Sequence, residues 1–358
     1  MRRSMKNAIS LFLLSMGVSS LMAQTSEFKI DVQQTGAPIQ STMYGIFFED
    51  INFGADGGLY AELIKNRSFE FENPFGGWIP FGNVTVQTKS PCFDKNPHYV
   101  RLSYNKELTG TGLDNEGFKG IGIKAGEKYD FSFYARTVTN GPIKFRINLV
   151  NSGHDIYETK EVEINGKDWR KYSVVLTPEA TEAHSRLRIT MLTQGTADLE
   201  HISLFPQKTF NNRPNGMRAD LAQALKDLKP GVFRFPGGCI VEGTNLATRY
   251  QWKNTVGPVE NRLININRWN YTFPHKKFSD YYQSYGLGFF EYFQLSEDIG
   301  AEPLPVLNCG LSCQYENDDP KENCPVDKLQ PYIDDALDLI EFANGPVTSE
   351  WGKLRVDM

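Results

Sequence analysis

The sequence has few of the residues that build metal centres or disulfide scaffolds. Its 358 residues include only five cysteines and five histidines. The spacing of Cys309, Cys313 and Cys324 does not match a zinc site, and no nearby histidine completes it. A disulfide scaffold of this length would need many more cysteines. We therefore expect no metal and no cofactor. We expect thiols that are buried or lie in loops, and one disulfide between two of them remains an alternative.

An excess of basic residues and a long apolar run are also missing. The formal net charge is −5, which argues against a nucleic-acid-binding surface and suits a neutral substrate better. One apolar run, from Ile9 to about Val18, follows a basic start and precedes Ala23. Because this run is too short to cross a bilayer, it predicts a signal peptide over residues 1–23. We expect an exported protein, periplasmic or extracellular, with no membrane attachment after cleavage.

The middle of the chain has the pattern of β-structure. Between about Pro74 and Pro206 short segments such as 143–149 and 187–191 alternate apolar and polar residues, and turn sequences such as 140–142 separate them. Strands with one apolar and one polar face at regular spacing indicate an antiparallel sandwich. We expect a domain over 74–206 of the jelly-roll, galactose-binding-like type.

The segments on either side alternate between strands and helices. Apolar strands are predicted at 44–48, 232–235 and 304–308, and helices at 59–66, 217–228, 278–299 and 326–342. Buried apolar strands that alternate with helices indicate a parallel sheet. The predicted fold class is α/β, an incomplete (β/α)8 TIM barrel with about three of the eight strand–helix units. It is formed by residues 24–73 and 207–358, and the sandwich is inserted between them.

One motif has the chemistry of a ligand site. The strand at 232–235 delivers Arg234 and runs into Pro236-Gly237-Gly238. Glycine has no side chain and tolerates positive φ, so this turn brings bare backbone and one fixed cation up to a ligand. Residues at the carboxyl ends of barrel strands line active sites.

Several separated motifs, in this order, resemble one family. They are Tyr44-Gly-Ile-Phe-Phe-Glu-Asp-Ile-Asn52, Gly57-Gly-Leu-Tyr-Ala-Glu-Leu63, Arg234-Phe-Pro-Gly-Gly-Cys239, Trp252-Lys-Asn-Thr-Val-Gly-Pro258, Tyr282-Gln-Ser-Tyr-Gly-Leu-Gly288 and Pro303-Leu-Pro-Val-Leu-Asn308. The chain is similar in these motifs to the longer form of the α-L-arabinofuranosidases of glycoside hydrolase family 51. The similarity covers essentially the whole chain after the signal peptide.

The resemblance implies a retaining hydrolase that removes terminal non-reducing α-L-arabinofuranosyl units from arabinan, arabinoxylan or arabinogalactan. It also implies a (β/α)8 catalytic barrel with a carbohydrate-binding-like sandwich inserted after the first strand, which corresponds to 74–206. The partner it implies is an arabinose-containing plant polysaccharide or oligosaccharide. Members of the family often form homo-oligomers.

The resemblance also assigns substrate-binding roles. Glu49 is similar to a strand-1 carboxylate that binds sugar hydroxyls, and a loop carboxylate paired with an arginine is the structural alternative. Arg234 is similar to an arginine that holds neighbouring active-site carboxylates, which suits its forked guanidinium. A buried structural ion pair is the alternative there.

Four further candidates for substrate binding are less specific. Cys239 lies where other branches of the family carry a sugar-contacting asparagine, and a small packing residue is the alternative. Trp252 and Trp269 could each stack on a sugar ring or belong to the core. Asn308, at the end of the third strand, is placed to face the site.

Both catalytic glutamates of the family are absent from this sequence. A retaining glycosidase needs an acid/base and a nucleophile, and the family carries them on later strands, beyond Met358. No Asn-Glu pair follows Asn308. We therefore predict that this chain alone is inactive, and expect it to be the N-terminal portion of the enzyme, from a partial gene model or a split reading frame.

The alternative function is that of a non-catalytic carbohydrate-binding protein that works through the sandwich. Aromatic side chains on one face of the sandwich, with Trp169, Tyr134 and Tyr157 as candidates, would support it. An unrelated barrel enzyme such as an isomerase is disfavoured, because nothing in the sequence resembles a metal or phosphate site.

Overall fold

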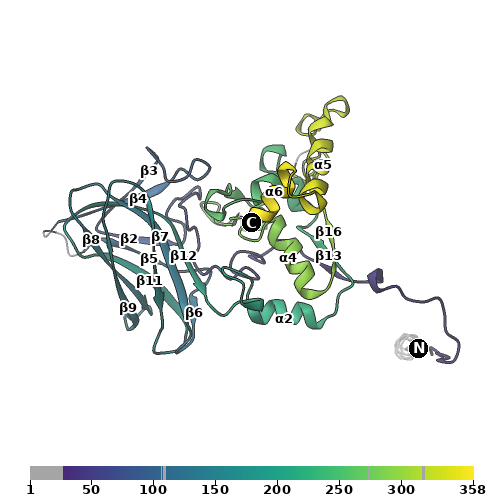
Figure 1. Ribbon diagram of the computed structural model, residues 1–358, viewed down its shortest axis with the longest axis horizontal. Helices are drawn as coiled ribbons and strands as arrows, with labels where there is room; N and C mark the ends of the chain where they lie inside the picture. Colours follow the sequence, from purple (N-terminus) through teal and green to yellow (C-terminus); the bar gives the residue numbers. More distant parts are fainter. Residues whose placement is uncertain (1–26, 106, 108–109, 273–274, 317–318) are drawn as a thin grey trace, which may run out of the picture. The chain divides into compact units, whose positions relative to one another are not determined.

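A computed structural model describes residues 27–105, 107, 110–272, 275–316 and 319–358 (Figure 1). The predicted signal peptide, residues 1–23, lies outside these residues. The chain divides into two compact units, residues 1–40 and 41–358. In the first unit, residues 27–40 are exposed turns and irregular chain. All that follows concerns the second unit.

Two antiparallel sheets form the predicted sandwich. One has the strand order β10–β7–β12–β4–β3, and the other β2–β5–β11–β8–β9, with β6 paired to β11. The strands are β2 (Trp78–Phe81), β3 (Asn83–Gln87), β4 (Tyr99–Tyr104), β5 (Gly112–Asn115), β6 (Ile121–Ile123), β7 (Tyr129–Thr137), β8 (Ile143–Val150), β9 (Ile156–Ile164), β10 (Arg170–Leu176), β11 (Glu182–Met191) and β12 (Gly195–Pro206). The sandwich expected from the alternating sequence is confirmed.

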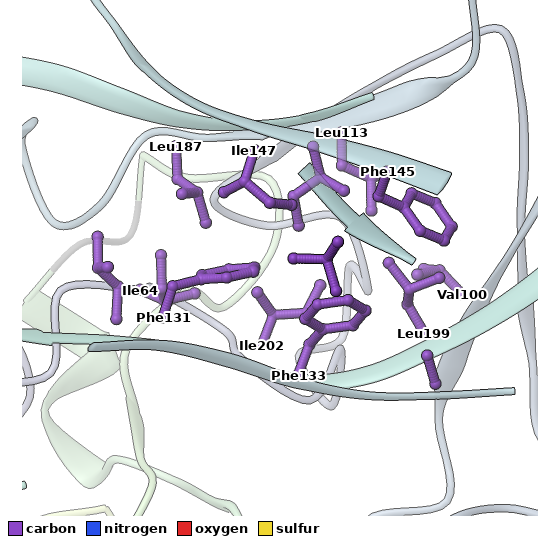
Figure 2. Packing of buried hydrophobic residues seen from close by; sticks show 14 of the residues in the cluster. Ile64, Val100, Leu113, Phe131, Phe133, Phe145, Ile147, Leu187, Leu199 and Ile202 are labelled. Atoms are coloured by element: carbon purple, nitrogen blue, oxygen red, sulfur yellow. The ribbon is translucent and has the colours of Figure 1, made fainter. Parts of the chain in front are cut away.

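The sandwich core lies between the two sheets. Phe131 and Phe133 of β7 point toward Phe145 and Ile147 of β8, and all four side chains are fully buried (Figure 2). Along β7 every second residue is buried, as the period of a strand requires. Full burial of such side chains contributes roughly 1.5–3 kcal/mol each, which makes this core a main source of the domain's stability.

A three-stranded parallel sheet forms the other part of the unit. Its order is β1–β13–β16, so β13 (Val232–Phe235) lies between β1 (Ile46–Phe47) and β16 (Glu302–Pro305). The helices are α2 (Ala219–Asp227), α3 (Cys239–Glu242), α4 (Phe289–Ile299), α5 (Gln330–Asn344) and α6 (Glu350–Asp357). Among the described residues, no helix combines the length and apolar character needed to cross a membrane.

The remaining elements are short. A two-stranded antiparallel sheet joins β14 (Asn265–Ile266) to β15 (Tyr282–Gln283). Single 3-10 turns cover Ser41–Met43, Phe210–Asn212, Leu246–Thr248, Trp252–Thr255, Val259–Asn261, Arg268–Thr272, Pro320–Glu322 and Val326–Lys328.

Helix α4 covers one face of the parallel sheet. Its start is fixed by Glu291, whose carboxylate accepts a hydrogen bond from the Gly288 backbone N–H at 3.0 Å. Its end is set by Gly300, which takes the left-handed conformation with φ 77°. Between them, Tyr292 stacks on Phe235 of β13 with ring centroids 4.6 Å apart. This packing buries one face of β13 and leaves the other face free of the helix.

One predicted helical segment is wrong, and another begins later than predicted. Residues 59–66 form turns and irregular chain, because their backbone bonds elsewhere: Ala61 N–H donates to Gly216 and Leu63 N–H to Leu204. Residues 278–288 include β15, and α4 begins only after Gly288. The third strand ends at Pro305, earlier than predicted.

Helix α6 was not predicted. Ser349 caps it by accepting a hydrogen bond from Gly352 N–H, and a serine before Glu350 was the signal in the sequence.

The chain enters and leaves the sandwich at one place, where Glu62 is buried. Its carboxylate accepts hydrogen bonds from Ile64 N–H (3.0 Å), Ser203 Oγ (2.6 Å) and Leu204 N–H (2.9 Å). The guanidinium of Arg67, also buried, lies 3.6 Å away. Glu62 thereby ties the segment before the first sandwich strand to the end of β12.

We predict that Glu62→Gln lowers the free energy of unfolding by about 3 kcal/mol, because it removes the carboxylate that lies 3.6 Å from buried Arg67 and weakens the hydrogen bonds from Ser203 and Leu204. Chemical denaturation of both proteins measures the difference. Glu163→Gln is the matched control, since Glu163 is half exposed and 3.9 Å from Lys144. It should change stability by less than about 0.5 kcal/mol. Equal effects of the two substitutions would contradict the role of Glu62.

Candidate functional site

The end of β1 sends two adjacent carboxylates to opposite sides. Successive strand residues alternate in direction, and the sequence predicted this divergence for Glu49 and Asp50. Asp50 is only 2% exposed, whereas Glu49 is partly exposed. Phe48 N–H donates to the carbonyl of Arg234 and extends the pairing of β1 with β13. Glu49 therefore lies beside the turn that follows β13.

Glu49 is held by two donors on one oxygen. Its Oε1 accepts from Ile240 N–H in α3 at 3.0 Å and from the indole Nε1 of Trp269 at 3.3 Å. Within the described residues no hydrogen bond to Oε2 occurs, so this oxygen can accept from a ligand.

Gly237 makes the close approach of Glu49 possible. It has φ +148°, and a Cβ at this position would lie 2.5 Å from Cγ of Glu49. The Pro-Gly-Gly turn thus brings its backbone against the carboxylate of Glu49. The sequence predicted that this turn brings bare backbone up to a ligand.

Arg234 lies on the uncovered face of the parallel sheet. Its side chain is exposed, and its guanidinium is 4.6 Å from the ring centroid of Phe47. Arg234 forms no ion pair among the described residues. Within these residues it therefore neither holds active-site carboxylates, as the resemblance implied, nor belongs to a buried ion pair, which was the structural alternative. The cause is the strand period: Phe233 and Phe235 face α4, and Arg234 faces away.

Cys239 opens helix α3 directly after the glycine turn and is partly exposed. Burial raises the pKa of its thiol above the usual value, so the neutral form is favoured. The charge of Arg268 lowers the pKa of this thiol, and the charges of Glu49 and Glu242 raise it.

Asn308 organises a loop rather than facing an open site. Its Nδ2 donates to the carbonyls of Val241 (2.9 Å) and Leu311 (2.8 Å), and its Oδ1 accepts from Gly310 N–H (2.7 Å). Because both amide hydrogens are used by backbone carbonyls, Asn308 fixes the chain after β16 against α3.

Trp252 is a core residue. Its side chain is 1% exposed and packs against Phe342 and Trp351, with ring centroids 5.6 Å and 4.8 Å away. Its Nε1 donates to the carbonyl of Asp335 at 2.9 Å. The prediction of a substrate-binding role is therefore corrected, since no face of the indole reaches a ligand.

Trp269 is the tryptophan that lies at the site. Besides its bond to Glu49, the guanidinium of Arg268 lies 4.4 Å from its ring centroid. Nη2 of Arg268 in turn donates to Sγ of Cys313 at 2.7 Å. The indole of Trp269 therefore contacts a carboxylate through its N–H and a cation through its ring.

The side chain of Asp50 faces the interior, and the pKa of its carboxyl group is raised. Its Oδ1 accepts from Ala55 N–H and from the hydroxyl of Tyr281, both at 2.9 Å. Burial, and next to it the charge of Asp56, raise the pKa of Asp50 to about 7. Asp56 is also buried, and its carboxylate accepts from the N–H and hydroxyl of Ser284. Apart from the Glu49-Asp50 dipeptide, nothing in the sequence pointed to this buried network.

We predict that the stability of the protein depends on pH through Asp50. The folded protein keeps the Asp50 proton up to about pH 7, whereas the unfolded chain releases it near its ordinary value of 3.8. Stability is therefore lost as the pH rises from 4 to 7. Each pH unit between the two pKa values changes the free energy of unfolding of the wild type by ~1.4 kcal/mol. Relative to wild type, the free energy of unfolding of Asp50→Asn should therefore be about 2–3 kcal/mol higher at pH 8 than at pH 5.

Denaturation of both proteins at the two pH values gives this difference. Titrating groups that do not interact with Asp50 cancel from it, whereas Asp56, whose charge acts on Asp50, does not. A difference that is the same at both values would contradict it.

The aromatic candidates of the sandwich do not share one face. Tyr157 belongs to β9 in one sheet, whereas Tyr134 belongs to β7 in the other and Trp169 precedes β10. The hydroxyl of Tyr134 donates to Glu260 at 3.1 Å. The Trp169 ring is stacked by Arg136 at 4.5 Å. The single aromatic face expected from the sequence is therefore not formed by these three residues.

The face that carries Tyr134 is also attached to the loop around Glu260. Lys171 of β10 forms an ion pair with Glu260 at 3.1 Å. Asn96 donates to the carbonyls of Glu260 (3.1 Å) and Arg262 (2.7 Å). Arg262 is buried and pairs with Glu291 of α4 at 2.9 Å. Polar contacts therefore run from the sandwich to the helix that covers the parallel sheet.

Comparison with known proteins finds similarity to α-L-arabinofuranosidases and to a carbohydrate binding domain. Residues 224–358 match the model of the α-L-arabinofuranosidase 1 domain, and residues 61–197 match that of a carbohydrate binding domain. An extracellular exo-α-L-arabinofuranosidase of Streptomyces chartreusis is 40% identical over 92% of this chain. An α-L-arabinofuranosidase 1 of Arabidopsis thaliana is 36% identical over 90%.

A solved structure agrees. An arabinose-bound family 51 α-L-arabinofuranosidase superposes with a TM-score of 0.79 at 32% identity and covers 88% of this chain. The chain spans 40% and 47% of the two relatives and 51% of the solved chain. The predicted resemblance is thus confirmed: the chain has an α/β fold with an inserted carbohydrate-binding sandwich, similar to the N-terminal portion of family 51 α-L-arabinofuranosidases.

Proposed function

We propose that this chain is the sugar-binding N-terminal portion of an exported, retaining α-L-arabinofuranosidase. The observation that carries the proposal is the carboxylate of Glu49, which Ile240 N–H and the Trp269 indole fix on one oxygen, while its Oε2 accepts no hydrogen bond from the described residues. Such a preorganised acceptor beside an aromatic ring suits sugar hydroxyls. The substrate would be the terminal non-reducing arabinofuranosyl unit of arabinan or arabinoxylan.

The other proposed contacts surround Glu49. Cys239 begins the helix whose Ile240 N–H binds Glu49, and Arg234 lies near the same turn, its Nη2 3.9 Å from where a Cβ of Gly238 would be. Asn308 contributes indirectly, because it fixes the loop after β16. Residues 24–73 and 207–358 would form part of a (β/α)8 barrel around this site, and residues 74–206 the inserted sandwich.

We predict that the purified 358-residue polypeptide gives no turnover. A retaining mechanism needs two carboxylates ~5–5.5 Å apart, and the family resemblance assigns both to strands that follow Asn308 and are not among these residues. Hydrolysis of p-nitrophenyl α-L-arabinofuranoside is the measurement, with a full-length relative as positive control. Release of nitrophenol above the rate of the buffer would refute the prediction.

We predict that the same polypeptide binds an α-1,5-linked arabino-oligosaccharide and that Glu49→Gln weakens the affinity about 10-fold or more, since a hydrogen bond to a charged group contributes ~1.5–3 kcal/mol. An NMR titration gives the dissociation constants. Glu163→Gln, a half-exposed residue of β9, is the control and should bind like wild type.

The alternative, carbohydrate binding by the sandwich, is favoured by the match of residues 61–197 to a carbohydrate binding domain. The same titration separates the two functions. Binding that survives Glu49→Gln and is lost in Trp169→Ala would favour the sandwich, because Trp169 is a partly exposed tryptophan of that domain. Loss of binding in Glu49→Gln alone would favour the α/β site.

A further inference from the structure

We propose that Asp50 is a positioning residue for the sugar site, which it serves by fixing the turn that carries Trp269. The inference rests on the proposed function, because it concerns the site formed by Glu49 and Trp269. The side chain of Asp50 is buried and accepts from Ala55 and Tyr281, whereas Glu49 accepts from Ile240 and Trp269. The influence of Asp50 runs through Asn267 and Tyr281.

The first connection starts from the backbone of Asp50. Its carbonyl accepts a hydrogen bond from Nδ2 of Asn267 at 3.0 Å. Oδ1 of Asn267 in turn accepts from the backbone N–H of Trp269 at 2.8 Å. Asn267 is 1% exposed, so water does not compete for these bonds. One amide therefore ties the end of β1 to the first residues of the Trp269 turn.

The second connection starts from the carboxylate of Asp50. It accepts from the hydroxyl of Tyr281 at 2.9 Å, and Tyr281 is fully buried. The backbone carbonyl of Tyr281 accepts from Asn267 N–H at 2.9 Å and from Nδ2 of Asn270 at 2.6 Å. Tyr281 N–H donates to Oδ1 of Asn270 at 3.1 Å. The tyrosine thus holds both ends of the turn from Asn267 to Asn270.

Together the two connections and Glu49 surround the turn. Glu49 binds the indole of Trp269 on the ligand side, while Asp50 anchors the base of the same turn from the interior. Buried hydrogen-bond networks in which the members are paired give rigidity. A binding site loses affinity when its supporting residues allow a displacement of even about 1 Å. Asp50 and Tyr281 are therefore expected to act on sugar affinity through the placement of Trp269.

The experiment uses the full chain labelled with 5-fluorotryptophan, observed by ¹⁹F NMR and titrated with an α-1,5-linked arabino-oligosaccharide. Trp269→Phe assigns the resonance of Trp269. The test variants are Asp50→Ala, which keeps the backbone carbonyl but removes the side-chain oxygen that accepts from Tyr281, and Tyr281→Phe, which removes only the hydroxyl. The matched control is Tyr282→Phe, because the hydroxyl of Tyr282 accepts from Glu72 N–H at 2.8 Å, away from the Asp50 network.

We expect both test variants to shift or broaden the Trp269 resonance and to weaken sugar affinity about 3- to 10-fold, while Tyr282→Phe changes neither. An unchanged Trp269 resonance in both test variants would overturn the inference. A shifted Trp269 resonance with unchanged sugar affinity would also overturn the inference, because Asp50 and Tyr281 would then have a structural role only. If the wild-type chain itself shows no binding, the proposed sugar site fails at that first step, and the positioning role fails with it.

Discussion

The arrangement of the whole α/β part depends on the buried carboxylate of Glu62. Strands β1 and β13 pair in parallel although the complete sandwich lies between them in the sequence. Bringing two such distant segments together carries an entropic cost that grows with the length of the intervening chain. Glu62 offsets it by binding Ser203 and Leu204 at the exit of the sandwich, so that the inserted domain begins and ends at one point.

A second constraint is the period of a strand, applied at the end of β1. Because neighbouring side chains point to opposite sides, one dipeptide supplies a carboxylate to the surface and another to the interior. Glu49 lies against the glycine turn, where only a residue without Cβ fits. Asp50 lies among Ala55, Tyr281 and Asp56, where burial keeps its proton to near-neutral pH. The open oxygen and the buried network thus follow from the same backbone geometry.

The sequence was informative where a pattern has one structural meaning. Alternation along 143–149 and 187–191 predicted the sandwich, and the apolar run at 232–235 predicted β13 at its observed bounds. It was misleading at 59–66, where helical spacing was present but hydrogen bonds to Leu204 and Gly216, distant in sequence, decided the conformation. For the candidate site, the motif located Glu49, but it could not distinguish Trp252 from Trp269. That distinction depends on Phe342 and Trp351, which pack around Trp252 from elsewhere in the chain.

The contacts between the sandwich and the loop around Glu260 have a consequence for evolution and engineering. Asn96 and Lys171 bind this loop, and Arg262 within it pairs with Glu291 of helix α4. Excision of residues 74–206 would remove these partners and would leave Glu62 without Ser203 and Leu204. The inserted sandwich is therefore not an exchangeable module, because the α/β part depends on it for these contacts.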